Sequence, residues 1–244
     1  MEIDDARVRL RSIAILSVLC DGALCQIAQN CVWTRINAGK AVVSHLSKDD
    51  NVYFIVEGSF QVGLTTASGR PVAFRRLLPG DYFGEIAALT GAPRSANVVA
   101  ETAALLAVWP ANEFRALFRS NPSFAEAVSI SLARLAVSLS NRVFELSALE
   151  VRFRLYSELL RLARDGEKTD EGWVLRDVPT HENLAATIGA QREVVTRELK
   201  LLAQEGVVLT RKRREWVIVD IERLRSLLRQ RTGFSIPELP DWPE

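Results

Sequence analysis

The sequence predicts an α+β protein with a strand-rich N-terminal half, a long helix and a helical C-terminal half. Three observations predict this fold class. Short β-rich runs separated by Gly, Pro and Asp occupy the chain from Cys31 to about Pro110. A long helical pattern begins at Asn121-Pro122, and two helices at helix-turn-helix spacing follow Val178.

Composition and length limit the class of protein. The chain has 244 residues, of which 48% are hydrophobic and 25% charged, and its formal net charge is +1. A chain this apolar can offset its ordering entropy, which excludes intrinsic disorder, and its length is natural for two domains. The most apolar run, Ala103–Trp109, is far shorter than the ~20 residues that cross a bilayer, and the acidic N-terminus does not resemble a signal peptide. We therefore expect a cytoplasmic protein with no membrane contact.

Cysteine and histidine are too scarce for several kinds of site. The three cysteines (Cys20, Cys25 and Cys31) and two histidines (His45 and His181) cannot build a disulfide framework or a zinc finger. We expect both histidines to be surface or capping residues. Because no catalytic constellation is visible, we expect no enzyme and no metal.

The N-terminal half is expected to begin with short helices, since apolar and polar residues alternate at helical spacing over residues 7–30. Evenly spaced short strands then favour an antiparallel sandwich, jelly roll or barrel. The clearest predicted strands are Val52–Val56, Phe60–Leu64, Val72–Phe74 and Leu105–Trp109.

The long helix carries a narrow apolar seam. Asn121 is a favoured N-cap, and Pro122 suits the first helical position. The seam favours pairing with a second chain over a core helix of a monomer. It consists of apolar residues at 128, 132, 135, 139, 146 and 149, with Arg142 as a polar break. A second helix, Val151–Arg164, and a polar loop, Asp165–Glu171, are expected to follow.

The segment Gly80–Ala96 offers the parts of an anion site. Gly84 allows the backbone to approach a ligand, and a short helical turn near Glu85 would present free N–H groups. Arg94 supplies a planar fork for phosphate, and Ser95 a hydroxyl donor. A carboxylate beside a phosphate is repulsive unless it accepts a hydrogen bond from a sugar hydroxyl, so a phosphate fused to a ribose satisfies both groups.

A helix-turn-helix is predicted from His181 onward. One short helix runs to Ile188, Gly189 suits its left-handed cap, and a second helix starts near Gln191. The polar face of the second helix contains side-chain types that pair with base edges. These are Arg192, Glu193, Thr196, Arg197 and Lys200. The alternative is a surface helix stabilised by charge pairs such as Glu193 with Arg197. A hairpin around Thr210–Glu215 follows, with the basic residues 211–214 near its tip as a phosphate-contacting wing.

The motif Phe83-Gly84-Glu85-Ile86-Ala87, followed by Arg94-Ser95-Ala96, resembles the phosphate-binding cassette of cyclic-nucleotide-binding domains. The resemblance implies that Gly84, Glu85, Ile86 and Ala87 line the ribose-phosphate, with Glu85 taking the 2′-hydroxyl. It also implies that Arg94 neutralises the phosphate and that Ser95 bonds it. The alternative is a plain ion pair of Arg94 with Glu85 in a roll that binds no ligand.

Residues 10–225 together resemble the cyclic-AMP receptor protein group of the CRP/FNR family of bacterial transcription regulators. The resemblance implies a homodimer that binds double-stranded DNA as a palindrome of TGTGA-like half-sites, read by Arg192, Glu193 and Arg197, with RNA polymerase as a partner through the loop 165–176. The implied domains are a cyclic-nucleotide-binding β-roll (double-stranded jelly roll) with N-terminal helices over 1–120, a dimerisation helix over 121–149, a winged helix-turn-helix over 150–231 and a C-terminal tail over 232–244.

The base of the nucleotide is the least determined part of the resemblance. Leu139-Ser140 stands where the family has a Thr-Ser pair against the adenine, so Ser140 is retained and a hydroxyl is lost at Leu139. Arg75 is expected near the base as well. Cyclic AMP is therefore the expected allosteric ligand, with cyclic GMP as an alternative.

Two further alternatives stay open. Cys20, Cys25 and Cys31 resemble the N-terminal cysteines of iron–sulfur regulators, which would make the protein a redox or metal sensor, although a cluster needs four thiolates. Visible absorbance of anaerobically purified protein distinguishes that class. A nucleotide-binding protein whose DNA module serves only for assembly would bind every duplex equally.

Overall fold

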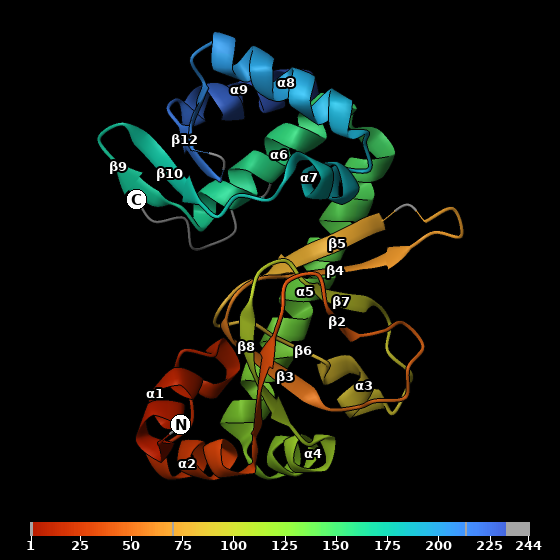
Figure 1. Ribbon diagram of the computed structural model, residues 1–244, viewed down its shortest axis with the longest axis vertical. Helices are drawn as coiled ribbons and strands as arrows, with labels where there is room; N and C mark the ends of the chain where they lie inside the picture. The colour runs from red at the N-terminus through yellow and green to blue at the C-terminus, as the bar shows by residue number, and fades with distance from the viewer. Residues whose placement is uncertain (1, 70, 213, 233–244) are drawn as a thin grey trace. The chain divides into compact units, whose positions relative to one another are not determined.

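The computed structural model describes residues 2–69, 71–212 and 214–232 (Figure 1). The chain divides into two compact units, Met1–Leu139 and Ser140–Glu244. The division falls inside the long helix, so that helix contributes residues to both units. The predicted α+β class is confirmed: a strand-rich N-terminal unit, a long helix and a helical C-terminal unit with its own small sheet.

The N-terminal unit begins with helices and continues with eight strands among its described residues. Its first elements are α1 (Ile3–Arg11), the 3-10 turn η1 (Ala14–Leu16) and α2 (Asp21–Asn30). The elements that follow are β1 (Val32–Ile36), β2 (Ala41–Val43), β3 (Val52–Glu57), β4 (Phe60–Thr65), β5 (Pro71–Leu77), β6 (Tyr82–Phe83), α3 (Glu85–Thr90), β7 (Asn97–Ala100), β8 (Ala104–Trp109), α4 (Ala111–Ser120) and α5 (Pro122–Ala148).

These strands form two antiparallel sheets, which makes the unit a β-roll. One sheet has the order β1-β8-β3-β6 and the other β2-β7-β4-β5. Side chains from both sheets, among them Ile55, Phe60 and Leu106, form one buried cluster. The helices pack on the other face of the first sheet, where Phe54 and Trp109 meet Phe114 and Phe124. Strand β3 is therefore covered on both faces, which explains its continuous apolar sequence.

The long helix α5 begins where the sequence predicts. The Asn121 side-chain oxygen accepts a 3.0 Å hydrogen bond from the Phe124 N–H, which is the expected N-cap contact. Val128, predicted to lie in the seam between two chains, is instead fully buried in the core of its own unit. The first turns of α5 therefore pack within the chain, and only the later part of the seam is exposed. The large apolar side chains exposed on α5 are Ile130, Val137, Leu139, Val143 and Leu146.

By length and composition, α5 is also long and apolar enough to cross a membrane. The expectation that no segment reaches this length considered only the most apolar run, Ala103–Trp109, and overlooked the longer, less apolar helix. The N-terminal turns of α5 are buried against protein, since Phe124 and Val128 belong to the core.

The C-terminal unit packs helices on a four-stranded sheet of order β11-β12-β10-β9. Its elements after α5 are α6 (Val151–Arg164), β9 (Glu167–Thr169), β10 (Gly172–Arg176), α7 (His181–Ile188), α8 (Arg192–Gln204), β11 (Val208–Lys212), β12 (Glu215–Ile218) and α9 (Ile221–Thr232). The segment predicted as the loop 165–176 is a hairpin, because β9 and β10 pair antiparallel. Trp173, Val174 and Leu175 of β10 are buried and also pair with β12. Helix α9 includes residue 232, and the rest of the predicted tail lies outside the described residues.

A cluster of four charged side chains joins the end of α5 to α6 within this unit. The Arg142 guanidinium donates to Glu158 at 2.9 Å and lies 3.5 Å from Glu145. Arg161 donates to Glu158 at 2.8 Å and also pairs with Glu145. Burial by itself raises the pKa of Glu158, but the charges of Arg142 and Arg161 outweigh it and hold that pKa below its usual value. The polar break predicted at Arg142 thus has a structural partner on the next helix.

Candidate functional site

Gly84 lies where other parts of the chain approach the backbone of the predicted anion-binding segment closely. Its φ of 98° lies in the left-handed region. A Cβ at this position would lie 2.4 Å from the Asn51 carbonyl oxygen and 2.6 Å from Arg94 Nη1. Both the backbone angle and the available space therefore require glycine immediately before α3.

The Arg94 guanidinium is buried and fixed by three acceptors. Nη2 donates to Asp49 Oδ2 at 2.5 Å and to the Asn51 carbonyl at 2.7 Å, and Nη1 donates to the Gly84 carbonyl at 3.1 Å. The cation also lies 5.5 Å from the centre of the Tyr53 ring. The side chain is therefore held in one position before any ligand binds.

One polar atom of this arginine has no partner in the described part of the chain. Arg94 Nε is buried and makes no hydrogen bond. A buried donor without an acceptor is costly, and an anion placed beside it removes that cost. Nε is therefore the donor of Arg94 from which a phosphate oxygen could accept a hydrogen bond.

Glu85, the next residue after Gly84, is almost completely buried. Burial raises the pKa of its carboxyl, while the charge of Arg75 on β5 opposes the rise. Backbone N–H groups of Gly84 and Glu85 and the charge of Arg94 also favour the ionised form. In the described chain no hydrogen bond or ion pair joins Glu85 to Arg94, whose carboxylate partner is Asp49. The alternative of a plain Arg94–Glu85 pair is therefore wrong.

The remaining predicted pocket residues are placed in two groups. Ala87 is buried in α3, whereas Ile86 and Ser95 are exposed beside Glu85 and Arg94. Leu139 and Ser140 are both exposed on α5, and Leu139 exposes 41% of its surface. The structure therefore brings the six cassette residues together in the N-terminal unit and leaves Leu139 on the helix surface. Arg75, expected near the base, lies close enough to influence Glu85 and Asp81.

Two contacts connect this segment to the helices of the same unit. Tyr82, two residues before Gly84, lies near Ser131 on α5, whose side chain opposes the rise that burial causes in the pKa of Tyr82. Arg115 on α4 donates to the Ala88 carbonyl of α3 at 2.8 Å. A ligand held at Gly84 and Glu85 would therefore lie next to groups that contact α4 and α5.

The C-terminal unit contains the predicted helix-turn-helix. Thr180 caps α7 by accepting a 3.2 Å hydrogen bond from the Asn183 N–H, and Gly189 ends the helix with a φ of 64°. Gln191 stands at the N-cap of α8 without a side-chain cap, as its residue type predicts. Both helices are fixed by apolar residues in one core, including Leu184, Val195 and Leu199.

Helix α8 has a buried apolar face and an exposed polar face. Val195, Leu199 and Leu202 are buried. The predicted DNA-reading residues Arg192, Glu193, Thr196 and Arg197 are all exposed. The Arg197 side chain exposes 68% of its surface, and its ion pair is a loose 3.6 Å contact with Glu198. The arginine is therefore free to extend toward a ligand.

His181 makes contacts that sequence reasoning missed. Its Nδ1 atom lies 2.9 Å from the Thr196 hydroxyl on α8, and its ring meets the Trp216 ring edge-on at 5.9 Å. Burial, followed by the charge of Arg192, lowers the pKa of His181. The expectation of a plain surface or capping residue did not identify it as a contact between α7, α8 and β12.

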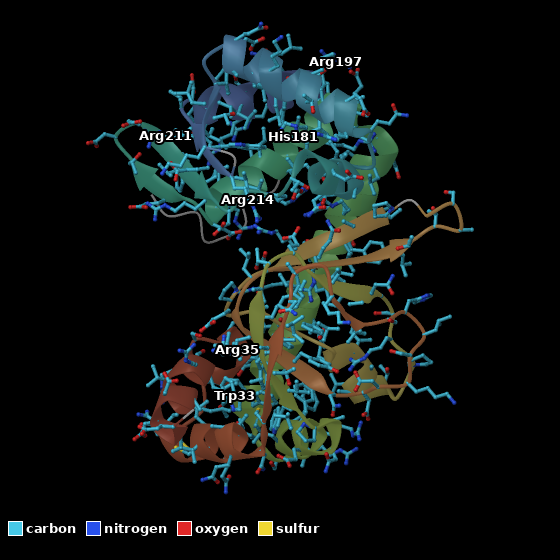
Figure 2. All side chains as sticks on the ribbon, viewed as in Figure 1. Trp33, Arg35, His181, Arg197, Arg211 and Arg214 are labelled. Carbon is cyan, nitrogen blue, oxygen red and sulfur yellow. The ribbon has the colours of Figure 1, made fainter. Side chains whose placement is uncertain are left out.

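Two basic residues of the hairpin that the sequence predicts as a phosphate-contacting wing make contacts within the protein. Arg214 donates to the carbonyl groups of Val178 and Asp177 at 3.2 and 3.3 Å, and Arg211 pairs with Glu171. Figure 2 shows Arg211 and Arg214 on the sheet side of the unit, apart from Arg197 on α8. Arg213 lies outside the described residues. Two of the four predicted phosphate contacts are thus already used within the protein.

The three cysteines differ in environment. Cys20 is exposed, Cys25 is half-buried and Cys31 is buried. Burial raises the pKa of Cys31 to about 12, which disfavours the thiolate that binds metals. Across the described residues, no group of three or more Cys, His, Asp or Glu side chains is arranged to hold a metal ion.

Comparisons with known families match both units. Residues 33–121 match the family described as cyclic nucleotide-binding domain. Residues 153–227 match the Crp-like helix-turn-helix domain. The first match contains the Gly84–Arg94 segment, and the second contains α7 and α8.

Curated relatives include the "cAMP-activated global transcriptional regulator CRP" of Escherichia coli O6:H1. It is 30% identical over 162 residues, which cover 66% of this chain and 77% of that protein. The "CRP-like cAMP-activated global transcriptional regulator" of Mycobacterium tuberculosis is 29% identical over 189 residues, covering 76% of this chain and 83% of that protein.

Solved structures agree with the fold. A CRP-family transcriptional regulator from Thermus thermophilus superposes with a TM-score of 0.66 at 26% identity, covering 80% of this chain and 96% of that one. FixK2 from Bradyrhizobium japonicum has a TM-score of 0.74 at 17% identity, covering 81% of this chain and 96% of that one. The second likeness concerns the fold alone.

Proposed function

Because this chain belongs to the CRP/FNR family of DNA-binding transcription regulators, we propose that cyclic AMP switches it between states of different DNA affinity. In this proposal a homodimer in the cytoplasm binds palindromic TGTGA-like sites. The observation that carries the proposal is the buried Arg94 guanidinium, fixed by Asp49 and retaining one unpaired donor at Nε.

Each cassette residue would contact a different part of the nucleotide. Arg94 would bind the cyclic phosphate, Ser95 would add a hydroxyl donor, and Glu85 would accept from the 2′-hydroxyl of the ribose. Gly84 supports this assignment because its missing side chain leaves the backbone open at the same point. Ile86 and Ala87 would line the sugar-phosphate.

Cyclic AMP is favoured over cyclic GMP by the names of the relatives, two of which are described as cAMP-activated. On this chain, Leu139 and Ser140 would face the base. The hydroxyl of Ser140 remains available to a purine, while Leu139 offers only apolar contact. We therefore propose cyclic AMP as the ligand with weaker discrimination against cyclic GMP.

A second copy of the chain is the proposed cover of the exposed apolar side chains on α5. Leu139, Val143 and Leu146 are large, apolar and exposed, and their spacing places them on one side of α5. Pairing of two such helices removes these side chains from water. Arg142, which lies among them, is already paired with Glu158, so a partner helix would not meet an uncompensated charge.

The proposed DNA contacts are Arg192, Glu193, Thr196 and Arg197. Arginine forms bidentate bonds with guanine, and glutamate accepts from the amino group of cytosine. The exposure of all four residues on one helix of a helix-turn-helix supports this role. Two α8 helices of a dimer would meet successive major grooves about 34 Å apart.

The proposed switch is a shift in population between two states of α5. The ligand would act through Tyr82, which lies near Ser131 on α5. The other end of α5 is tied to α6 by the Arg142–Glu158 pair. One helix thus contacts the pocket segment in one unit and the DNA-binding core in the other.

RNA polymerase is the proposed partner on the promoter, with the β9–β10 hairpin as its contact. The hairpin's exposed strand, Glu167–Thr169, supports this assignment. We propose no catalytic activity. Transcription from a promoter carrying the site, with purified polymerase, tests the contact by comparison of the native chain with Lys168→Ala.

The test of the function is a titration in two formats. Calorimetry with cyclic AMP and with cyclic GMP measures ligand binding, and fluorescence anisotropy with a TGTGA palindrome measures DNA binding with and without each nucleotide. We expect binding of cyclic AMP and a gain in affinity for the palindrome over a random duplex. Nucleotide binding without any change in DNA affinity would contradict the switch, and equal affinity for both duplexes would contradict specific recognition.

A further inference from the structure

The hydroxyl of Thr196 on α8 is already used within the protein. Its Oγ1 atom lies 3.0 Å from the Arg192 carbonyl oxygen and 2.9 Å from His181 Nδ1. A hydroxyl has one hydrogen to donate and two lone pairs to accept with. Because a carbonyl oxygen can only accept, both contacts are hydrogen bonds only when the Thr196 hydrogen goes to Arg192 and His181 Nδ1 donates to Oγ1.

His181 is held in place for this bond. The residue is the first of α7, and its ring packs edge-on against Trp216, which is buried in β12. With a proton fixed at Nδ1, the neutral ring carries its lone pair at Nε2. The His181 ring therefore remains a donor to Thr196 whether it is neutral or charged.

What Thr196 can offer to DNA follows from this arrangement. Its side chain is exposed on the same face as Arg192 and Arg197, yet its hydroxyl has no hydrogen left to donate to a base or phosphate, and His181 occupies one of its two lone pairs. The methyl group is the part of the side chain without a hydrogen-bond partner. In the major groove, the apolar group that such a methyl can contact is the 5-methyl of thymine.

We propose that Thr196 recognises a thymine through contact between its methyl group and the 5-methyl of the base. We propose that His181 is the positioning residue, because its hydrogen bond keeps the Thr196 hydroxyl engaged within the protein. The inference rests on the proposed function, since it requires α8 to lie in the major groove. It adds an apolar specificity contact between the polar readers Arg192 and Arg197.

The test begins with selection of a preferred duplex from a random-sequence pool by the full chain in cyclic AMP. Each thymine of that duplex is then replaced in turn by deoxyuridine, which lacks only the 5-methyl group. We expect one thymine per half-site at which the native chain loses about fourfold in affinity, the effect of one buried methyl-sized group. Thr196→Ser, which keeps the hydroxyl, should lose this sensitivity, and Thr196→Val, which keeps a methyl, should retain it.

Thr187→Ser is the matched control. The Thr187 hydroxyl makes the same helical bond one turn back, to the Asn183 carbonyl at 2.9 Å, but within α7. This variant should retain native sensitivity to deoxyuridine. If Thr196→Val loses sensitivity while Thr196→Ser keeps it, the hydroxyl is the contact and the proposal is wrong. An enriched duplex that tolerates deoxyuridine everywhere overturns this inference alone, whereas a pool without enrichment overturns the proposed function and this inference with it.

The role of His181 has a readout that does not involve DNA. The chain has two histidines, so nitrogen-15 spectra of the imidazoles are simple to assign with His45→Gln. We expect the neutral His181 ring to carry its proton at Nδ1. His181→Asn, whose amide N–H can replace that donor, should retain the deoxyuridine effect, and His181→Leu should reduce it. A proton at Nε2 would overturn the assignment.

Discussion

Arg94 Nη2 and Asp49 Oδ2 lie 2.5 Å apart and join residues that are 45 positions apart in the chain. Burial raises the pKa of Asp49, but hydrogen bonds from Tyr53 and Arg94 outweigh it and lower that pKa overall. The carboxylate therefore stays charged and keeps the arginine oriented. A ligand phosphate would meet a cation whose position is already fixed, which reduces the entropy lost on binding.

Replacement of the pocket cation should remove ligand binding. We expect Arg94→Ala to weaken the binding of cyclic AMP by at least about 2 kcal/mol, because a charge-assisted contact is lost and the charge of Asp49 then faces the phosphate without its cation. Calorimetry measures the affinity, and thermal unfolding checks the fold. Arg76→Ala is the control, since Arg76 in the same roll also pairs with a carboxylate, Glu101 at 2.5 Å, outside the cassette. Equal affinity of Arg94→Ala and the native chain would refute the pocket.

The preference for cyclic AMP over cyclic GMP should depend on residue 139 of α5. Leu139→Thr restores a hydroxyl beside Ser140, and we expect the affinity ratio of cyclic AMP to cyclic GMP to rise, because a hydroxyl can bond to a base edge and a Leu cannot. Competition titrations measure the ratio. Val137→Thr, at a similarly exposed apolar position two residues earlier, should leave the ratio unchanged. No difference between the two variants would remove residue 139 from the base contact.

Substitution of Arg197 should weaken specific DNA binding more than non-specific DNA binding. We expect Arg197→Ala to cost ~1–3 kcal/mol on the preferred duplex and little on random DNA, since a base contact carries sequence information. Anisotropy at fixed salt measures both. Arg176→Ala provides the comparison, because Arg176 is equally exposed but lies on β10 and pairs with Glu167. Equal losses on both duplexes would make Arg197 a backbone contact.

The charge cluster between α5 and α6 should make the C-terminal unit sensitive to acid. The pKa of Glu158 is lowered in the folded protein, so the unfolded chain binds the proton at higher pH. The stabilisation is therefore present at neutral pH and is lost as pH falls below the ordinary range of a glutamate. Urea unfolding at pH 7 and pH 4 measures it.

Glu158→Gln should destabilise the unit by about 3 kcal/mol at pH 7, since it leaves two half-buried arginines short of a partner, and should lose less stability on acidification than the native chain. Glu205→Gln, at an exposed position in the same unit, should leave the pH dependence as it is. An unchanged pH profile in Glu158→Gln would show that the cluster does not set this dependence.

The sequence by itself determined the fold class and the motifs that lie within short stretches. The Gly84–Arg94 segment, the Gly189 turn and the cap at Asn121 depend on spacing and backbone preference, which are local. The strands with strong apolar alternation were also predicted. The hairpin at β9 and β10 was not, because β9 is exposed along its whole length and carries no such pattern.

Only the tertiary structure decided the partners of the charged and polar side chains. Arg94 pairs with Asp49 rather than Glu85, and Arg142 pairs with a glutamate on the next helix. His181 meets Thr196 and Trp216, which lie on two later elements. Residue type shows that such a group needs a partner, but the choice depends on which distant segments the buried core brings within hydrogen-bonding distance.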